Sequence, residues 1–251
     1  MCGEFWNGWF DHFGEQHHTR ELDDYEKELF LHDTLAGLTE YGTEAWSDTA
    51  YGALVNRQAA CGGYALACKL LFDVAGIKSA AISGKARNES GVEAPHMWLA
   101  AEINREWYFV DPTWDDPVSS NGFHIVRHTY FNVTQAQTAN SHFDYSLPGG
   151  IECVSEKEDY YLRSERLVRD ESGIDRIEEA MRTVKALPAH LEYRIEGEEL
   201  YKSIFSAREE NGGFADRIKN SVPDAENMLC SYSFDRDRNI IHIYVRNKVK
   251  E

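Results

Sequence analysis

The spacing of apolar residues predicts a helical start to the chain. Over residues 21–40, the apolar side chains near one helical face are Leu22, Tyr25, Leu29, Leu35 and Leu38. A second helix is predicted over residues 62–75, which are rich in Ala and Leu, and Gly76 ends it. A short strand is expected over residues 77–84. The predicted order is therefore helix, helix, strand.

Two alternating segments then predict a β-hairpin. Residues 97–103 (MWLAAEI) and 106–111 (EWYFVD) alternate in polarity and flank Asn104-Arg105. Arginine is less favourable than glycine at the second turn position, so the sequence leaves the turn type open.

Turn-forming residues separate two parts of the chain. The sequence is loop-rich after residue 117, and LPGG (147–150) marks a candidate boundary. We predict an α+β fold with one domain over residues 1–150 and a small C-terminal α+β accessory domain over residues 151–251.

The second part also mixes helix and strand. A helix is predicted over residues 172–187, stopped by Pro188, and another over residues 196–210. The apolar face of the first of these is formed by Ile174, Ile177, Met181 and Val184. The segments 228–234 and 240–245 predict a terminal hairpin. Nothing in this part has the pattern of a catalytic motif.

Composition restricts the class of partner. Hydrophobic residues make up 42% of the 251 positions and aromatic residues 12%, which is typical of a folded globular protein and not of a disordered chain. The 26 basic and 43 acidic residues give a net charge of −17. Nucleic acids and anionic membranes attract positive surfaces, so we expect neither as a partner. The C-terminal unit is a candidate surface for a protein partner.

The sequence shows no targeting segment. No stretch approaches the roughly 18 apolar residues of a membrane helix. The N-terminal residues MCGEFWNGWFDHFGEQ lack the basic and apolar regions of a signal peptide. As written, the chain would stay in the cytoplasm, and an excised part of an exported protein is an equal alternative.

One cysteine stands in a setting that favours reactivity. The five cysteines, which lack the spacing of a disulfide framework or a zinc site, are Cys2, Cys61, Cys68, Cys153 and Cys230. Cys61 directly precedes the second predicted helix, where free backbone N–H groups and the helix dipole favour a thiolate and suit an oxyanion. Gly62 and Gly63 leave the approach to the sulfur uncrowded. Cys68 is expected in the core.

The hairpin supplies a base for this candidate nucleophile. A turn centred on Asn104-Arg105 pairs position 96 with position 113. His96 and Asp111 then lie diagonally on one face, within about 7–8 Å of each other, whereas a shift of one residue would separate them. In this arrangement His96 takes the thiol proton and later protonates the leaving amine, while Asp111 fixes the tautomer of the imidazole.

Three motifs around these residues resemble the transglutaminase-like superfamily, whose core is papain-like. They are C-G-x-Y-A at Cys61–Ala65, H-x-W at His96–Trp98 and W-Y-x-V-D-x-T-W-D-D-P at Trp107–Pro117. The resemblance extends over about residues 30–150, and the stretches YGALVNRQAAC and YFNVT look like bacterial members. It implies a Cys-bearing helix packed on an antiparallel sheet, with a catalytic triad of Cys61, His96 and Asp111.

The resemblance implies acyl transfer on peptide or protein amides through a thioester acyl-enzyme. Hydrolysis by a cysteine peptidase is our first expectation, because water needs no dedicated acceptor site. A protein-glutamine transglutaminase or deamidase, a silent peptide- or protein-binding module and a structural domain of a larger assembly stay open. We expect no cofactor and no metal, since no acidic cluster suits calcium and His17-His18 lacks a third ligand.

Other residues near the motifs are weaker candidates. Gln58 is the candidate oxyanion donor. Trp98 and Trp114 are candidate walls of the cleft, with aromatic core packing as the alternative. Asp115 and Asp116 are expected in a solvated acidic turn.

Overall fold

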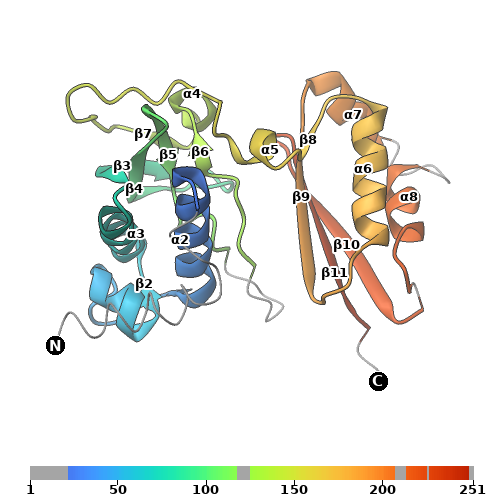
Figure 1. Ribbon diagram of the computed structural model, residues 1–251, viewed down its shortest axis with the longest axis horizontal. Helices are drawn as coiled ribbons and strands as arrows, with labels where there is room; N and C mark the ends of the chain where they lie inside the picture. Colours follow the sequence, from blue (N-terminus) through green and yellow to red (C-terminus); the bar gives the residue numbers. More distant parts are fainter. Residues whose placement is uncertain (1–21, 118–124, 207–212, 225, 249–251) are drawn as a thin grey trace.

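The computed structural model describes residues 22–117, 125–206, 213–224 and 226–248. Figure 1 shows two bodies of mixed helix and sheet side by side, with α5 (Tyr160–Arg163) between them. Each body contains its own mainly antiparallel sheet. The predicted α+β class is thereby confirmed, while the domain boundary at residue 150 stays a prediction.

A five-stranded antiparallel sheet in the order β6-β5-β4-β3-β7 forms the first body. Its strands are β3 (Lys78–Arg87), β4 (Glu93–Ile103), β5 (Glu106–Val110), β6 (Phe131–Val133) and β7 (His142–Phe143). The other elements of this body are α2 (Asp24–Leu38), β1 (Glu40–Tyr41), the π-helical turn η1 (Gly52–Asn56), β2 (Gln58–Ala59), α3 (Cys61–Ala75) and α4 (Gln135–Thr138). Helix α3 packs on β3 and β4, and α2 packs on α3.

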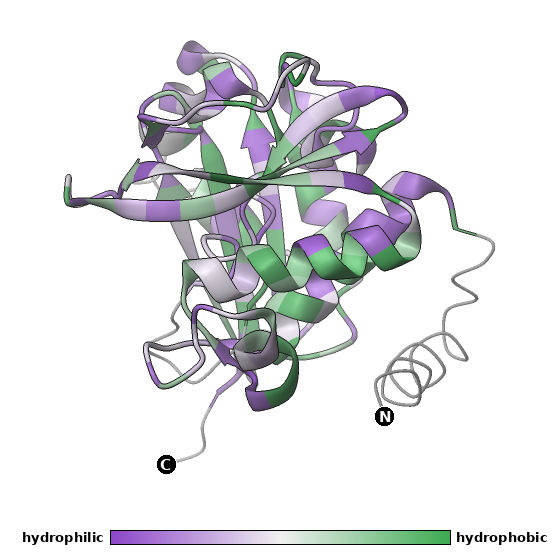
Figure 2. Ribbon diagram, turned by 90° about the vertical axis from the view of Figure 1, so that its left-hand side faces the viewer, coloured by the Kyte–Doolittle hydropathy of each residue, from purple (hydrophilic) through white to green (hydrophobic). Residues whose placement is uncertain are grey.

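Helix α3 confirms the second predicted helix. It begins at Cys61, and no side chain caps its first turn. It ends at Ala75 and is capped by Gly76, whose φ of 82° lies in the left-handed region that favours glycine. Its large side chains in the core are Tyr64, Cys68, Leu71 and Phe72. Figure 2, viewed from this side of the molecule, shows that most of the helix is hydrophobic.

The buried face of α2 is more polar than its apolar spacing predicts. The helix starts with a capping box in which Asp23 and Glu26 bond each other's backbone N–H groups. Glu28 and His32 are fully buried on the helix, whereas Leu29 is only half-buried. The predicted face is therefore partly wrong, because a polar side chain can occupy a buried position once it finds a partner.

The hairpin of β4 and β5 has the predicted register. Leu99 pairs with Val110 and Ile103 pairs with Glu106. Asn104 and Arg105 have φ values of 53° and 69°, and two consecutive left-handed residues define a type I′ turn. This turn matches the right-handed twist of the strands, so it fixes the pairing without a glycine.

A four-stranded sheet in the order β10-β11-β9-β8 forms the second body. Its strands are β8 (Leu167–Val168), β9 (Ala189–Ile195), β10 (Met228–Asp235) and β11 (Ile240–Asn247). Its helices are α6 (Glu171–Arg182), α7 (Glu198–Ser206) and α8 (Phe214–Asn220). In Figure 1 the sheet stands between these helices and the first body.

The structure confirms the terminal hairpin and refines the helices of the second body. Helix α6 ends at Arg182, six residues before the predicted stop at Pro188, and β9 begins directly after that proline. The short helix α8 has no counterpart among the predicted elements. Across the described ranges, no helix is long and apolar enough to cross a membrane.

Buried ion pairs join the two bodies. His128, in the loop before β6, donates from Nε2 to Asp33 of α2 (2.8 Å) and from Nδ1 to Glu192 of β9. His32 donates to Asp33 (2.9 Å), and its Nε2 lies 3.3 Å from Asp115. Each imidazole therefore faces a carboxylate at both nitrogens, and both histidines are held as imidazolium ions.

The charges of this network predict how stability depends on pH. Burial opposes the charged form, but Asp115 and Asp33 outweigh it and raise the pKa of His32 to about 9. Burial is likewise outweighed at His128, where Glu192 and Asp33 raise the pKa to about 10. A raised histidine pKa contributes stability that is complete below the unfolded value of about 6.5 and lost as pH rises through the folded value.

We therefore expect the free energy of unfolding to fall by more than about 1 kcal/mol between pH 6.5 and 9.5. Urea unfolding of the wild type and of His128→Gln at these two pH values checks this. The variant, which lacks one titrating group, should show the shallower fall. Equal falls in both proteins would contradict the assignment of a charged His128.

Candidate active site

The first turn of α3 presents a half-buried thiol. Cys61 is the first residue of the helix, and the N–H group of Ala60 before it donates to the carbonyl oxygen of Ser47 (3.0 Å). The hydrogen bond with His96 lowers the pKa of Cys61 despite the opposing effect of burial, and the backbone at Met97 and Gly62 contributes in the same direction. Thiolate is the nucleophilic form of cysteine, so this environment favours attack.

Strand β4 brings the imidazole of His96 to this thiol. Its Nε2 donates to Oδ2 of Asp111 at 2.6 Å, which leaves Nδ1 for the hydrogen bond with Cys61. Burial opposes protonation of His96, but the charge of Asp111 outweighs it and raises the pKa of the imidazole to about 10. A lowered thiol pKa beside a raised imidazole pKa favours a thiolate–imidazolium pair.

Asp111, directly after β5, is held from both of its oxygens. Its Oδ1 accepts the backbone N–H groups of Thr113 (3.1 Å) and Trp114 (3.3 Å). Its Oδ2 accepts from His96 and also from Nε2 of His142 (3.1 Å). Burial acts against the carboxylate, but the two histidines outweigh it and hold the pKa of Asp111 well below its usual range. The predicted triad residues thus lie in one hydrogen-bonded line.

His142 is the residue of this site that the sequence interpretation missed. It opens the two-residue strand β7, which pairs with β3 so that Ala86 faces His142. The segment around it was predicted only as loop, and no periodic pattern marks a strand of two residues. The sequence offered one signal, the adjacent Ser141 and His142. The place of His142 in the site follows only from the pairing of β7 with β3.

The comparisons with known proteins bear on this geometry. The sequence model of the transglutaminase-like superfamily matches residues 11–112, a span that contains Cys61, His96 and Asp111. The chain carries a transglutaminase-like core. The match supports a cysteine-based enzyme and leaves peptidase and transglutaminase activity unresolved. No curated protein matches the chain.

Two solved structures are similar to part of the chain. One, described as a TGase, has a TM-score of 0.35 and 16% sequence identity, and covers 60% of this chain and 35% of its own. The other, a candidate cysteine protease from Cytophaga hutchinsonii, has a TM-score of 0.31 and 20% identity, and covers 39% of this chain and 34% of its own. The chain therefore spans about a third of the length of either structure.

The glycines after Cys61 have a packing role in the transglutaminase-like core. A Cβ at Gly63 would overlap the carbonyl oxygen of Ser47, and one at Gly62 would lie 3.3 Å from Oδ1 of Asp48. Both glycines are buried. They let the loop before η1 lie directly on the helix, so an open approach to the sulfur is not their main effect.

The three residues predicted as cleft walls or oxyanion donor differ in where the structure places them. Trp98 is fully buried in the core beneath His96, so its prediction as a cleft wall is wrong. Trp114 is partly exposed, and its ring centre lies 5.1 Å from that of His96. Trp114 also lines a cavity of about 600 Å³, to which none of the three triad residues contributes. Gln58 lies partly exposed in β2 with its side chain against Gly42, and its oxyanion role stays a prediction.

The expectation of a solvated acidic turn is wrong. Asp115 is fully buried and accepts the N–H group of Tyr130 at 3.0 Å. Asp116 is also buried and accepts the hydroxyl of Tyr64 from α3. The turn after β5 folds back under the helices, and these carboxylates bind groups from distant parts of the chain, which local spacing does not reveal.

Among the residues that the structure describes, three groups of side chains have the composition and closeness that a metal ion needs, with ligand atoms within 4.8 Å of one another. They are His96, Asp111 and His142; His32, Asp33 and His128; and His190, Glu192 and His242. In the first group, hydrogen bonds to Asp111 engage both Nε2 atoms. We assign that group to hydrogen bonding. The pair His17-His18 lies outside the described residues.

The burial of Asp115 gives a revised prediction. Asp115→Asn should lower the free energy of unfolding by about 2–4 kcal/mol, because it leaves the buried imidazolium of His32 without one of its carboxylates. Asp73→Asn is the matched control, since Asp73 forms an exposed pair with Lys69 on α3 and should cost less than about 1 kcal/mol. Urea unfolding at pH 7 measures both, and equal effects would contradict the structural role of Asp115.

Proposed function

We propose that the chain catalyses acyl transfer on peptide or protein amides. The thiolate of Cys61 attacks the amide carbonyl, and His96 donates its proton to the leaving amine as the C–N bond breaks. A thioester remains on Cys61. Water, losing a proton to His96, then attacks the thioester, and the C–S bond breaks to release the acid and restore the thiolate of Cys61 beside the protonated His96. Asp111 stabilises the imidazolium in both steps.

The observation that carries this proposal is the hydrogen-bonded line from the half-exposed thiol to a buried carboxylate. The other described cysteines lack such a base. Burial raises the pKa of Cys153 to about 12 and that of Cys230 to about 11, and it also raises the pKa of Cys68 well above its usual value. Only one of the four described thiols is therefore placed for nucleophilic chemistry.

The surroundings of the thiol support a polypeptide substrate. Tyr41, Trp46 and Tyr51 are 48%, 67% and 55% exposed on the segment before α3. Burial and then the charge of Cys61 raise the pKa of Tyr41, so this phenol lies near the sulfur. An exposed aromatic side chain such as Tyr41 beside a nucleophile suits the apolar side chains of a peptide.

Hydrolysis is the outcome that we propose first. Transamidation needs a second site that holds an amine and excludes water, whereas hydrolysis needs only water at the thioester. Protein-glutamine transamidation or deamidation is the alternative outcome of the same thioester. A silent binding module is the other alternative, and the hydrogen-bonded triad weighs against it.

The first test is selective alkylation. In a Cys2→Ser background, iodoacetamide at pH 7 should modify Cys61 at least about tenfold faster than Cys68, Cys153 or Cys230, because only its pKa is lowered. Peptide mapping by mass spectrometry gives the four rates. His96→Ala should remove the advantage of Cys61. Equal rates in the wild type would count against the triad and favour the binding module.

The second test measures turnover on a peptide library with and without an added amine. New peptide termini report hydrolysis, an amine adduct reports transamidation, and conversion of Gln to Glu reports deamidation. His96→Ala and Asp111→Asn should lower turnover by about 10²–10⁴-fold with smaller changes in KM, since both act on the proton transfer. Full turnover in either variant would overturn its assigned role. Activity should fall below the pKa of the thiol and again as pH approaches about 10, where His96 loses its proton.

A further inference from the structure

His142 is buried against the triad without belonging to it. It is 2% exposed, and its ring lies among those of Trp98, Trp114 and Tyr130, with centre distances of 4.8, 4.8 and 5.2 Å. Its Nε2 is 3.1 Å from Oδ2 of Asp111. The proposed mechanism uses Cys61, His96 and Asp111 and assigns no role to His142.

The contacts of His142 define its tautomer. Oδ2 of the ionised Asp111 can only accept, so Nε2 of His142 must carry a hydrogen. Burial lowers the pKa of His142, which keeps the ring neutral, so Nδ1 must be the acceptor. The group that faces Nδ1, at 2.9 Å, is the hydroxyl of Ser141, which therefore donates to it.

Two further contacts direct the hydroxyl of Ser141 toward this ring. The guanidinium of Arg238 donates from Nη2 to Oγ of Ser141 (3.0 Å), and a guanidinium cannot accept the hydroxyl hydrogen in return. The carbonyl oxygen of Thr138 lies 3.1 Å from the same Oγ but already accepts the N–H group of Ser141 at 2.8 Å. The hydroxyl of Tyr130 also hydrogen-bonds Ser141, but it can donate as well as accept. The acceptor that needs the hydrogen of Ser141 is therefore Nδ1 of His142.

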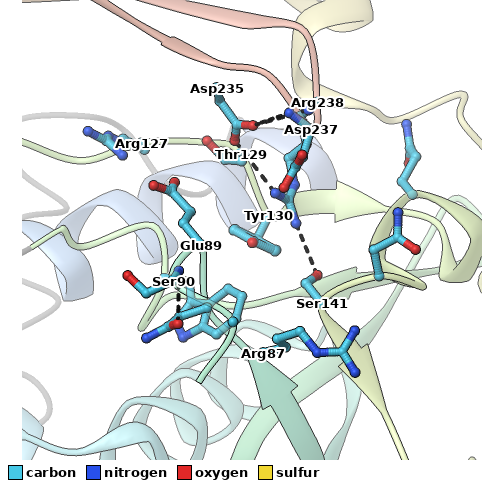
Figure 3. A pocket seen from close by; sticks show the side chains of 15 residues that line it. Arg87, Glu89, Ser90, Arg127, Thr129, Tyr130, Ser141, Asp235, Asp237 and Arg238 are labelled. Carbon is cyan, nitrogen blue, oxygen red and sulfur yellow. Dashed lines mark hydrogen bonds and ion pairs between the residues drawn. The ribbon is translucent and has the colours of Figure 1, made fainter. Parts of the chain in front are cut away.

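Arg238 is itself held in place from two sides. It lies in the turn between β10 and β11, and Nη1 is 3.5 Å from Oδ2 of Asp235. Its guanidinium carbon lies 4.2 Å from the ring centre of Tyr130 in the first body. Figure 3 shows Arg238 reaching from this turn past Tyr130 to Ser141.

We propose that His142 is a positioning residue for the triad and that Arg238, through Ser141, sets the tautomer in which His142 holds Asp111. This inference rests on the proposed function of Cys61. The hydrogen bonds then all point the same way. Arg238 donates to Ser141, Ser141 donates to His142, and His142 donates to Asp111. The second body thereby takes part in the active site through one side chain.

The expected consequence is a fixed carboxylate. With donors on both oxygens, Asp111 cannot rotate away from His96, and the imidazolium that stabilises the thiolate stays in place. The titratable or charged groups that face His142 are Asp111, His96, Arg238 and Tyr130. The reactivity of the Cys61 thiolate therefore reports whether Asp111 holds His96 in place.

The test follows the pH dependence of alkylation of Cys61 by iodoacetamide, in the Cys2→Ser background and with EDTA present. In His142→Ala the rate at pH 7 should fall about tenfold or more and its pH midpoint should rise, because Asp111 loses a donor and its fixed orientation. His142→Gln, whose amide can still donate to Asp111, should restore most of the rate. An unchanged or lowered midpoint in His142→Ala would overturn the proposal, as would a failure of Gln to restore the rate in a folded variant.

If substitutions at the buried His142 prevent folding, variants at Arg238 and Arg236 test the proposal instead. Arg238→Ala should shift the midpoint in the same direction by a smaller amount, about two- to fivefold in rate at pH 7, while the exposed Arg236→Ala should leave it unchanged. Ser141→Ala should match Arg238→Ala. Equal midpoints in Arg238→Ala and Arg236→Ala would overturn the role of Arg238.

The two proposals fail in different ways. If wild-type Cys61 reacts no faster than Cys153, or if His96→Ala reacts as the wild type does, the proposed function fails. If the wild type is fast and depends on His96 but His142→Ala matches it, the positioning role alone fails.

Discussion

The carboxylate of Asp111 is the interaction on which the site depends. A buried, ionised carboxylate is costly unless donors satisfy it, and here two backbone N–H groups and two imidazoles do so. The turn after β5 supplies the backbone donors, β4 supplies His96 and the pairing of β3 with β7 supplies His142. One charge thus links three strands and a turn, and the thiolate at the start of α3 is stabilised through it.

Charge also joins the two bodies of the molecule. Leu167 and Ile240 of the second body belong to the apolar cluster of the first. Beside this packing, His128 lies between Asp33 of one body and Glu192 of the other. Buried ion pairs of this kind contribute less to net stability than apolar surface of the same size, but they accept few alternative geometries. A second polar contact between the bodies is the hydrogen bond from Arg238, in the β10–β11 turn, to Ser141. Orientation of the second body and geometry of the triad are therefore coupled in our proposal.

The accuracy of the sequence interpretation differs between local and long-range features. The start of α3 at Cys61, its end at Gly76 and the register that brings His96 near Asp111 follow from neighbours in the chain. The burial of Asp115 does not, because its partners His32 and Tyr130 come from a helix and a loop that are distant in sequence. Acidic clusters are usually exposed to solvent, which is why the sequence predicted a solvated turn. The prediction fails because a buried cation, the imidazolium of His32, pairs with Asp115.

The sequence by itself determined that a thiol begins a helix, that a hairpin of fixed parity follows it and that the hairpin carries a histidine and a carboxylate on one face. These are consequences of helix capping, strand alternation and turn geometry, which act over a few residues. Only the tertiary structure decided which further polar groups meet them. His142 and Arg238 reach the site through strand pairing and through the contact between two sheets, and no local pattern encodes either. Burial makes those meetings selective, since each polar group removed from water requires its own partner.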